Sequence, residues 1–415
     1  MSAENFKIIF IGLLIFSTFV EIYLSFRQIK SVDSNRNNIP MNFRAIIQKK
    51  DHHKAASYTS AKSNLNIINL IFQAIFVYCL TIGGGINYFY EILNIYFKLN
   101  PNTFEVTLIL LLLAISSFVD IPFNLYKTFK IDAKFGFNKM NLRLYLTDLL
   151  KQSAISMIFM IPLLYISLWI FSSLGDFWWV WLWLFISLFN VSMLIIYPLF
   201  IAPLFNKFKP LDDKKTVHEI EKLMKKCGFK SNGLYVMNGS IRSTHGNAYF
   251  TGFGKAKRIV FFDTLLERLN INEIKAVLAH ELGHFAHNHV KKRIMIILFI
   301  SLLGLFFLDY LKNQDWFYFG LGLNYQSDAM ALIAFFIFTP LLMFFIKPIL
   351  SLYSRENEYE ADRYACKYSS ANDLKDSLIK LYRDNAATLT PDPMYSAFYD
   401  SHPSAINRIN ALTTK

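Results

Sequence analysis

Cysteine is scarce in this chain of 415 residues. Its three cysteines, Cys79, Cys227 and Cys366, lie far apart, and none belongs to a C-x-x-C pair. Isolated cysteines without that spacing predict neither a disulfide framework nor a zinc site built from cysteine. Any metal site must therefore be built from other residue types.

Charge is also sparse. Asp, Glu, Lys and Arg make up 18% of the residues, whereas 54% are hydrophobic, and the mean hydropathy is +0.31. Soluble domains are usually more polar than this. The 41 Phe and 22 Tyr residues suit lipid-facing and interfacial positions. The composition therefore indicates a membrane protein.

Long apolar stretches occur seven times, each with the length needed to cross a bilayer. The first begins with little charge and has no small-residue cleavage site, so we expect a retained span and not a signal peptide. The stretches are 6–26, 65–88, 104–126, 154–174, 178–204, 295–311 and 329–353. We predict an α-helical multi-pass protein with seven transmembrane helices.

Lys and Arg are concentrated in alternate loops. Segment 27–64 holds eight of them and segment 127–153 holds six, and 205–294 and 354–415 are also rich in them. The other three loops together hold only Lys98 and Lys312. The positive-inside rule makes the four basic segments cytoplasmic, with the N-terminus outside and the C-terminus inside. The net charge of +13 is distributed among these segments and forms no single basic patch. We therefore expect no nucleic-acid partner.

One short motif indicates metal-dependent chemistry. Residues 280–284 read H-E-x-x-H. On a helix, positions i and i+4 lie on one face, so His280 and His284 can share one metal ion. Glu281, beside the first histidine, can reach a metal-bound water and accept its proton. The motif is typical of a zinc-dependent hydrolase.

The residues around the motif favour a helix. Asn272 can cap it, and apolar residues recur at helical spacing from Ile274 to Phe285. Gly283 is a poor helix former, so its presence needs a reason, such as the close approach of another backbone.

A third ligand is needed, and it is usually His, or Glu from a later helix. The acidic segment 354–362 directly follows the last predicted span. Glu358 and Asp362 lie at i and i+4 there, so Glu358 could bind the metal while Asp362 accepts a hydrogen bond from a ligand imidazole. On spacing alone a solvated acidic helix is favoured, and Glu356 or Glu360 would compete as the ligand.

Several further blocks support a specific relationship. In chain order they are Ile121-Pro122-Phe123, 134–140, 147–150, 201–208, Asn247-Ala248-Tyr249, 262–266, 280–284, 358–362, and Ser401-His402-Pro403 with Arg408. Their order and approximate spacing resemble the type I CAAX prenyl protease family, which consists of integral-membrane zinc metalloendopeptidases of the Glu-zincin kind.

The resemblance implies a role for each matching residue. His280, His284 and Glu358 match the three ligands of one zinc ion, which is the implied cofactor. Glu281 matches the catalytic glutamate. Asp362 matches the carboxylate that steadies a zinc histidine.

Three more residues match positions near the substrate. His402 corresponds to a histidine near the scissile carbonyl, and Arg408 to a basic residue close to it. Asn247 corresponds to an asparagine on an edge strand that holds the substrate backbone, to which an extended peptide can add by main-chain hydrogen bonds. His289 also fits the family pattern, but it lies off the ligand face, so no zinc role is expected.

The family's fold implies seven transmembrane helices around a large chamber, capped on the cytoplasmic side by a zinc metalloprotease domain with a small β-sheet. The strand-like stretches 234–237 and 258–262, separated by a turn at 252–254, fit such a sheet. We divide the chain into five transmembrane helices (1–204), the metalloprotease domain with the edge strand and the H-E-x-x-H helix (205–294), two transmembrane helices (295–353) and a helical tail that completes the site (354–415). Glu21, Asp120 and Asn190 are costly in lipid and should face the interior of the helix bundle or water.

The activity implied by the resemblance is removal of the last three residues of a prenylated C-terminal C-a-a-X segment. One alternative is a broad membrane-protein quality-control protease without prenyl specificity. Another is a metal-binding transporter, although the His and Glu cluster lies outside the spans. The partners are then a peptide or protein substrate and the lipid bilayer. The Lys-, Asn-, Ile- and Phe-rich composition favours a bacterial inner membrane, with the endoplasmic reticulum membrane as the alternative.

Overall fold

The computed structural model describes residues 1–251 and 258–413. Within them, seven helices are long and apolar enough to cross a membrane, which confirms the seven predicted spans. The helices are α1 (Ala3–Ser34), α2 (Lys49–Leu80), α4 (Pro101–Tyr126), α5 (Leu142–Ser173), α6 (Trp178–Ile196), α11 (His289–Leu311) and α13 (Asp328–Tyr368). The spans of α4 and α6 continue to Asp132 and Phe205 through irregular helical turns.

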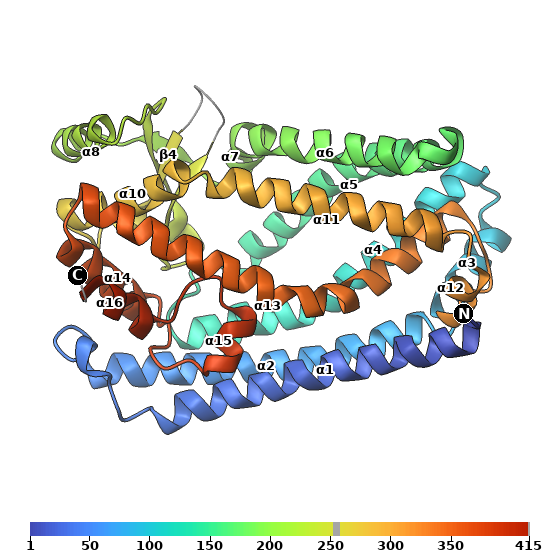
Figure 1. Cartoon of the computed structure of the whole chain (residues 1–415), viewed down its shortest axis with the longest axis horizontal. Helices are drawn as coiled ribbons and strands as arrows, with labels where there is room; N and C mark the ends of the chain where they lie inside the picture. The colour runs from blue at the N-terminus through green and yellow to red at the C-terminus, as the bar shows by residue number, and fades with distance from the viewer. Residues whose placement is uncertain (252–257, 414–415) are drawn as a thin grey trace.

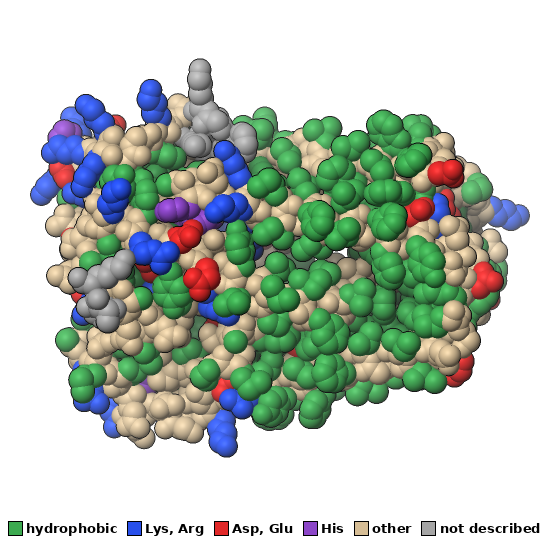
Figure 2. Space-filling view, in the orientation of Figure 1, with side chains coloured by type: hydrophobic (Ala, Val, Ile, Leu, Met, Phe, Trp, Pro, Cys, Tyr) green, Lys and Arg blue, Asp and Glu red, His purple; other side chains and the backbone are tan. Residues whose placement is uncertain are grey.

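The long helices run side by side and reach past the membrane. Helices α1, α2 and α5 have 32 residues each, or about 48 Å at 1.5 Å per residue, whereas the hydrocarbon core is about 30 Å thick. The N-terminus lies at one end of the bundle and the C-terminus at the other (Figure 1). The surface between the two ends is dominated by hydrophobic side chains (Figure 2). The polar elements therefore gather at the ends.

The spans are only partly buried by protein. In the most apolar window of α2 or α6, 6% of the residues are buried, against 50% for α13. Polar side chains of the spans are bonded to protein: Gln73 donates to Asp120 (2.7 Å) and Tyr399 donates to Glu21 (3.0 Å). Asn190 donates to the backbone oxygen of Ile186 on its own helix.

At the N-terminal end lie α3 (Gly85–Tyr96) and α12 (Asp315–Gly320) (Figure 1). The opposite end holds the remaining helices and the sheet. The helices are α7 (Ala202–Phe205), α8 (Lys214–Lys226), α9 (Asp263–Leu266), α10 (Ile271–Ala286), α14 (Ala371–Asp384), α15 (Pro393–Tyr399) and α16 (Ala405–Thr413).

The sheet has four strands in the order β1-β2-β4-β3. Strands β2 (Leu234–Met237) and β4 (Arg258–Phe262) are parallel and confirm the two predicted strands. Strand β1 (Phe208–Pro210) pairs antiparallel with β2, and β3 (Ala248–Thr251) pairs antiparallel with β4. The predicted turn at 252–254 lies outside the described residues. Strand β3 is thus an edge strand, as expected for the segment after Asn247.

Helix α10 begins two residues earlier than expected. Asn270, and not Asn272, is its cap: the Asn270 side chain accepts from the backbone N–H of Asn272 and of Glu273, and the Glu273 carboxylate accepts from the backbone N–H of Asn270. This reciprocal capping box needs a glutamate three residues after the cap, which only Asn270 has. Glu273 is also buried against the ammonium of Lys380 (2.6 Å).

Helix α13 is continuous from the membrane to the protease end. Its 41 residues span about 60 Å, roughly twice the hydrocarbon core. The expected boundary at 353/354 falls within this helix, and the one at 294/295 falls within α11. The last span is therefore the same helix that carries Glu358 and Asp362.

Candidate metal centre

Three side chains from two helices converge on one point. His280 and His284 lie on α10 and Glu358 lies on α13, with one ligand atom of each within 4.8 Å of the others. The two Nε2 atoms are 3.2 Å apart, and the Glu358 carboxylate oxygens lie 3.5 Å from Nε2 of His280 and 3.3 Å from Nε2 of His284. The structure therefore brings together the three predicted ligands.

Close packing of α10 on α13 makes this convergence possible. A Cβ atom at Gly283 would lie 2.9 Å from Cα and 3.0 Å from the backbone oxygen of Ala361. Real Cβ atoms essentially never come so close to backbone atoms. Gly283 is thus present because another backbone approaches at this point, as the sequence suggested.

The donor set suits a zinc ion. Two imidazole nitrogens and one carboxylate, with room for water, form the usual catalytic combination. Glu358 is buried, and its Oε2 atom makes no hydrogen bond of good geometry to any described residue, although Nδ1 of His402 lies 2.8 Å away. A buried carboxylate oxygen needs a partner, and a cation between the three ligands would provide it. The competing ligands are placed elsewhere: Glu356 is exposed and Glu360 contacts His289.

Asp362 and Arg408 lie behind the first histidine. Asp362 accepts from Nδ1 of His280 (2.8 Å), and both prongs of the Arg408 guanidinium reach Asp362 at 2.7 Å. Burial and the charge of Arg408 disfavour protonated His280, but hydrogen bonds to Asp362 and Glu358 outweigh them and raise its pKa to about 9. Burial acts against the Arg408 charge, but the contact with Asp362 prevails and raises the pKa of Arg408. All three side chains are buried.

A second pair, His289 and Glu360, lies behind the other histidine. Nδ1 of His289 is 2.9 Å from Nδ1 of His284, and Nε2 of His289 is 2.9 Å from the Glu360 carboxylate. His289 is buried, and its ring nitrogens contact His284 and Glu360 and not Glu358. The sequence predicts no zinc role for His289 and makes Glu360 only a competing candidate for the third ligand, so it does not predict this pairing. A histidine five residues after His284 and a glutamate two before Asp362 were the available signal.

The predicted catalytic glutamate is free to act. Glu281 is half-buried and has no hydrogen bond or ion pair to any residue in the described part of the chain. It follows His280 directly on α10, so it lies next to the ligand set. A carboxylate that must accept a proton from water needs such an unengaged position.

His402 faces the ligands from the C-terminal segment. Its side chain is 63% exposed, and Nδ1 lies 2.8 Å from Glu358. The segment is anchored at two places before His402. Asp392 accepts from the guanidinium of Arg27 on α1 (2.9 Å), and Arg355 on α13 donates to the backbone oxygen of Asp400 (2.9 Å). His402 is therefore an accessible side chain on a well-anchored loop.

Asn247 immediately precedes the edge strand β3 and is exposed. Its side-chain oxygen accepts from the backbone N–H of Ala248 (2.8 Å), and its backbone oxygen accepts from Phe262 (3.0 Å). The side-chain amide nitrogen has no partner among the described residues.

Comparisons with known proteins cover nearly the whole chain. Residues 28–207 match the family described as CAAX prenyl protease N-terminal, five membrane helices, and residues 210–415 match peptidase family M48. The CAAX prenyl protease 1 homolog of Arabidopsis thaliana is 32% identical, over 97% of this chain and 96% of that protein. The human CAAX prenyl protease 1 homolog is also 32% identical, over 100% of this chain and 97% of that protein.

A solved structure also matches nearly the whole chain. The crystal structure of S. mikatae Ste24p superposes with a TM-score of 0.91 at 30% identity, covering 98% of this chain and 99% of that one. The seven spans, the small sheet and the H-E-x-x-H helix all lie within these matches. The chain belongs to the CAAX prenyl protease family within peptidase family M48.

Proposed function

We propose that this protein is a zinc-dependent membrane endopeptidase that removes the C-terminal tripeptide of prenylated CAAX proteins. The observation that carries the proposal is the convergence of His280, His284 and Glu358 beside the unengaged carboxylate of Glu281. The names of the relatives, which are CAAX prenyl proteases, support the substrate class.

His280, His284 and Glu358 would hold the zinc ion. When bound there, zinc supplies Lewis-acid chemistry, because it polarises the peptide carbonyl and acidifies the attacking water. Glu281 accepts the proton of that water and passes it to the leaving amine. His402, exposed beside Glu358, donates a hydrogen bond to the carbonyl oxygen as negative charge develops on it.

The remaining residues position these groups. Asp362 fixes the ring of His280 through Nδ1, and Arg408 fixes Asp362 with two hydrogen bonds. Arg408 thereby acts behind the ligands, and its remaining guanidinium nitrogen, Nη1, lies 3.6 Å from Glu358. We therefore assign Arg408 a positioning role in place of the expected one beside the scissile carbonyl.

The substrate backbone would add to the sheet. Strand β3 is at the sheet edge, and Asn247 directly before it has a side-chain amide nitrogen with no partner in the described part of the chain. Main-chain hydrogen bonds to an edge strand hold an extended peptide largely independently of its sequence. Strand β3 would therefore bind the substrate backbone, and the groups that distinguish one substrate from another would be recognised by other parts of the protein.

We further propose that the metal centre faces the cytoplasm. Lys and Arg gather at the end of the molecule that holds α8 and α10 (Figure 2), and the positive-inside rule places such an end in the cytoplasm. Composition favours a bacterial inner membrane over the endoplasmic reticulum, and this assignment stays a prediction.

Purified protein in detergent tests the proposal with two peptides, one farnesylated on its CAAX cysteine and one unmodified. Cleavage of the farnesylated peptide that stops on addition of a chelator, and returns with zinc, is the expected result. Equal cleavage of both peptides would support broad quality-control proteolysis instead. No chelator-sensitive cleavage of either would contradict the proposed activity.

A further inference from the structure

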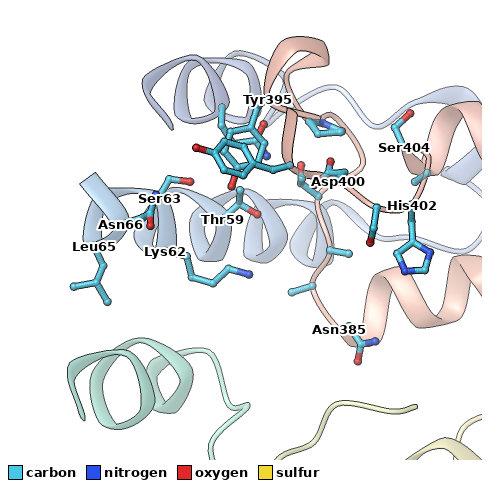
Figure 3. A pocket seen from close by; sticks show the side chains of 18 of the residues that line it. Thr59, Lys62, Ser63, Leu65, Asn66, Asn385, Tyr395, Asp400, His402 and Ser404 are labelled. Atoms are coloured by element: carbon cyan, nitrogen blue, oxygen red, sulfur yellow. The ribbon is translucent and has the colours of Figure 1, made fainter. Parts of the chain in front are cut away.

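A cavity of about 660 Å³, with a lining of mixed polar and apolar side chains, adjoins the metal centre through His402. Its volume is within the usual range for ligand pockets. One wall is formed by α2 and the end of α4, and the other by the segment from Tyr382 to Ala405, which includes His402. Figure 3 shows Lys62 reaching from α2 into this space, toward Asn385 and His402. The cavity is therefore continuous with the place where the scissile bond would lie.

Two lysines face the cavity without a counterion. Lys62 and Lys127 both line it and both are exposed. Neither is within ion-pair distance of a carboxylate among the described residues. Asp132 accepts a hydrogen bond from the hydroxyl of Tyr58 (2.8 Å), and the Lys62 ammonium lies 4.1 Å from the ring of that tyrosine. Asp400 also lines the cavity, but it forms no ion pair with either lysine among the described residues. Two like charges in one partly enclosed space favour an anion between them.

Amide side chains also line the cavity. Asn66, Asn69 and Asn124 lie on the same wall as the two lysines. The Asn69 side-chain oxygen is buried and accepts no hydrogen bond from any described residue. An isoprenoid chain in the cavity would leave these polar groups unpaired, at a cost in free energy.

We propose that Lys62 and Lys127 bind the free α-carboxylate of the substrate's last residue. The inference rests on the proposed function and adds the group that the enzyme recognises at the substrate's end. Three extended residues span about 10 Å. Because Lys62, Lys127 and His402 line the same cavity, a carboxylate held at the lysines and a bond held at His402 would together select the peptide bond that is cleaved. The cavity then sets the length of the released fragment.

The test compares two farnesylated CAAX peptides that differ only at the C-terminus, one a free acid and the other an amide. A charge-assisted hydrogen bond contributes about 1.5–3 kcal/mol, which corresponds to at least about tenfold. The native protein is therefore expected to prefer the acid at least about tenfold in kcat/KM, mainly through KM. In the double variant Lys62→Gln, Lys127→Gln the ratio of acid to amide should fall to about one.

The matched control is Lys130→Gln, an exposed lysine on the same turn as Lys127 that does not line the cavity. It should keep the native ratio. A native zinc-to-protein ratio shows that the double variant is folded, and each single variant should lose part of the preference. Equal cleavage of acid and amide by the native protein, or a preserved ratio in a folded double variant, would overturn the carboxylate site alone. Failure to cleave either peptide would overturn the proposed function as well.

Discussion

Arg408 and Asp362 form a buried, two-pronged ion pair directly behind His280, with both hydrogen bonds at 2.7 Å. Lysine cannot reproduce the planar fork of arginine. A residue 46 positions later in the chain thus determines how Asp362 holds a metal-ligating ring.

The variant Arg408→Lys is therefore expected to weaken zinc binding by about 10–100-fold, as for other partners of metal ligands. Titration with a competing chelator measures the affinity. Arg363→Lys, at an exposed position on α13, is the control and should bind zinc normally. Native affinity in Arg408→Lys would show that the fork is dispensable.

Glu281→Gln should keep zinc and lose hydrolysis, because the amide is similar in shape but cannot accept the proton. A loss of about 10²–10⁴-fold in kcat is expected for a general base. Elemental analysis and peptide cleavage measure the two properties on one sample. Native turnover in this variant would remove Glu281 from the mechanism.

Glu358→Ala should lower the zinc content, since it removes one of three ligands and leaves two histidines. Glu356→Ala changes an exposed glutamate on the same helix and should leave the zinc content unchanged. An unchanged zinc-to-protein ratio in Glu358→Ala, with a reduced one in Glu356→Ala, would reassign the third ligand.

His289→Ala should also weaken zinc binding, because it removes the hydrogen-bonding partner of Nδ1 of His284. Glu360→Gln should show a smaller effect in the same direction, since Glu360 reaches the metal only through His289. His287→Ala, with a side chain 43% exposed and 4.0 Å from Glu360, is the control. Native affinity in His289→Ala would make this pair purely structural.

Gly283→Ala should destabilise the protein, because the new Cβ would lie 2.9 Å from the Cα atom of Ala361. Overpacking of this kind costs about 1–3 kcal/mol and would move His284 away from Glu358. Thermal unfolding in detergent and zinc content measure the two effects. Gly12→Ala, where nothing lies within 4 Å, should be neutral or mildly stabilising; equal melting temperatures for the two variants would contradict the close approach.

Much of the protein follows from local sequence. The seven spans are determined by runs of apolar residues, because a bilayer imposes a length on each helix. His280 and His284 meet because four residues make one helical turn, and strands β2 and β4 are determined by short apolar runs. The predicted cap of α10, Asn272, was wrong by two residues. The cap is Asn270, because only Asn270 has a glutamate, Glu273, three residues after it.

The rest required tertiary structure. On spacing alone Glu356, Glu358 and Glu360 were equivalent, and only the packing of α13 on Gly283 turns Glu358 toward the two histidines. His289 contacts Glu360, which lies 71 positions later in the chain. Lys62 and Lys127 line one cavity although they are 65 positions apart. Periodicity determines which face of a helix a residue occupies, whereas the side chain it meets depends on how the helices are placed against one another.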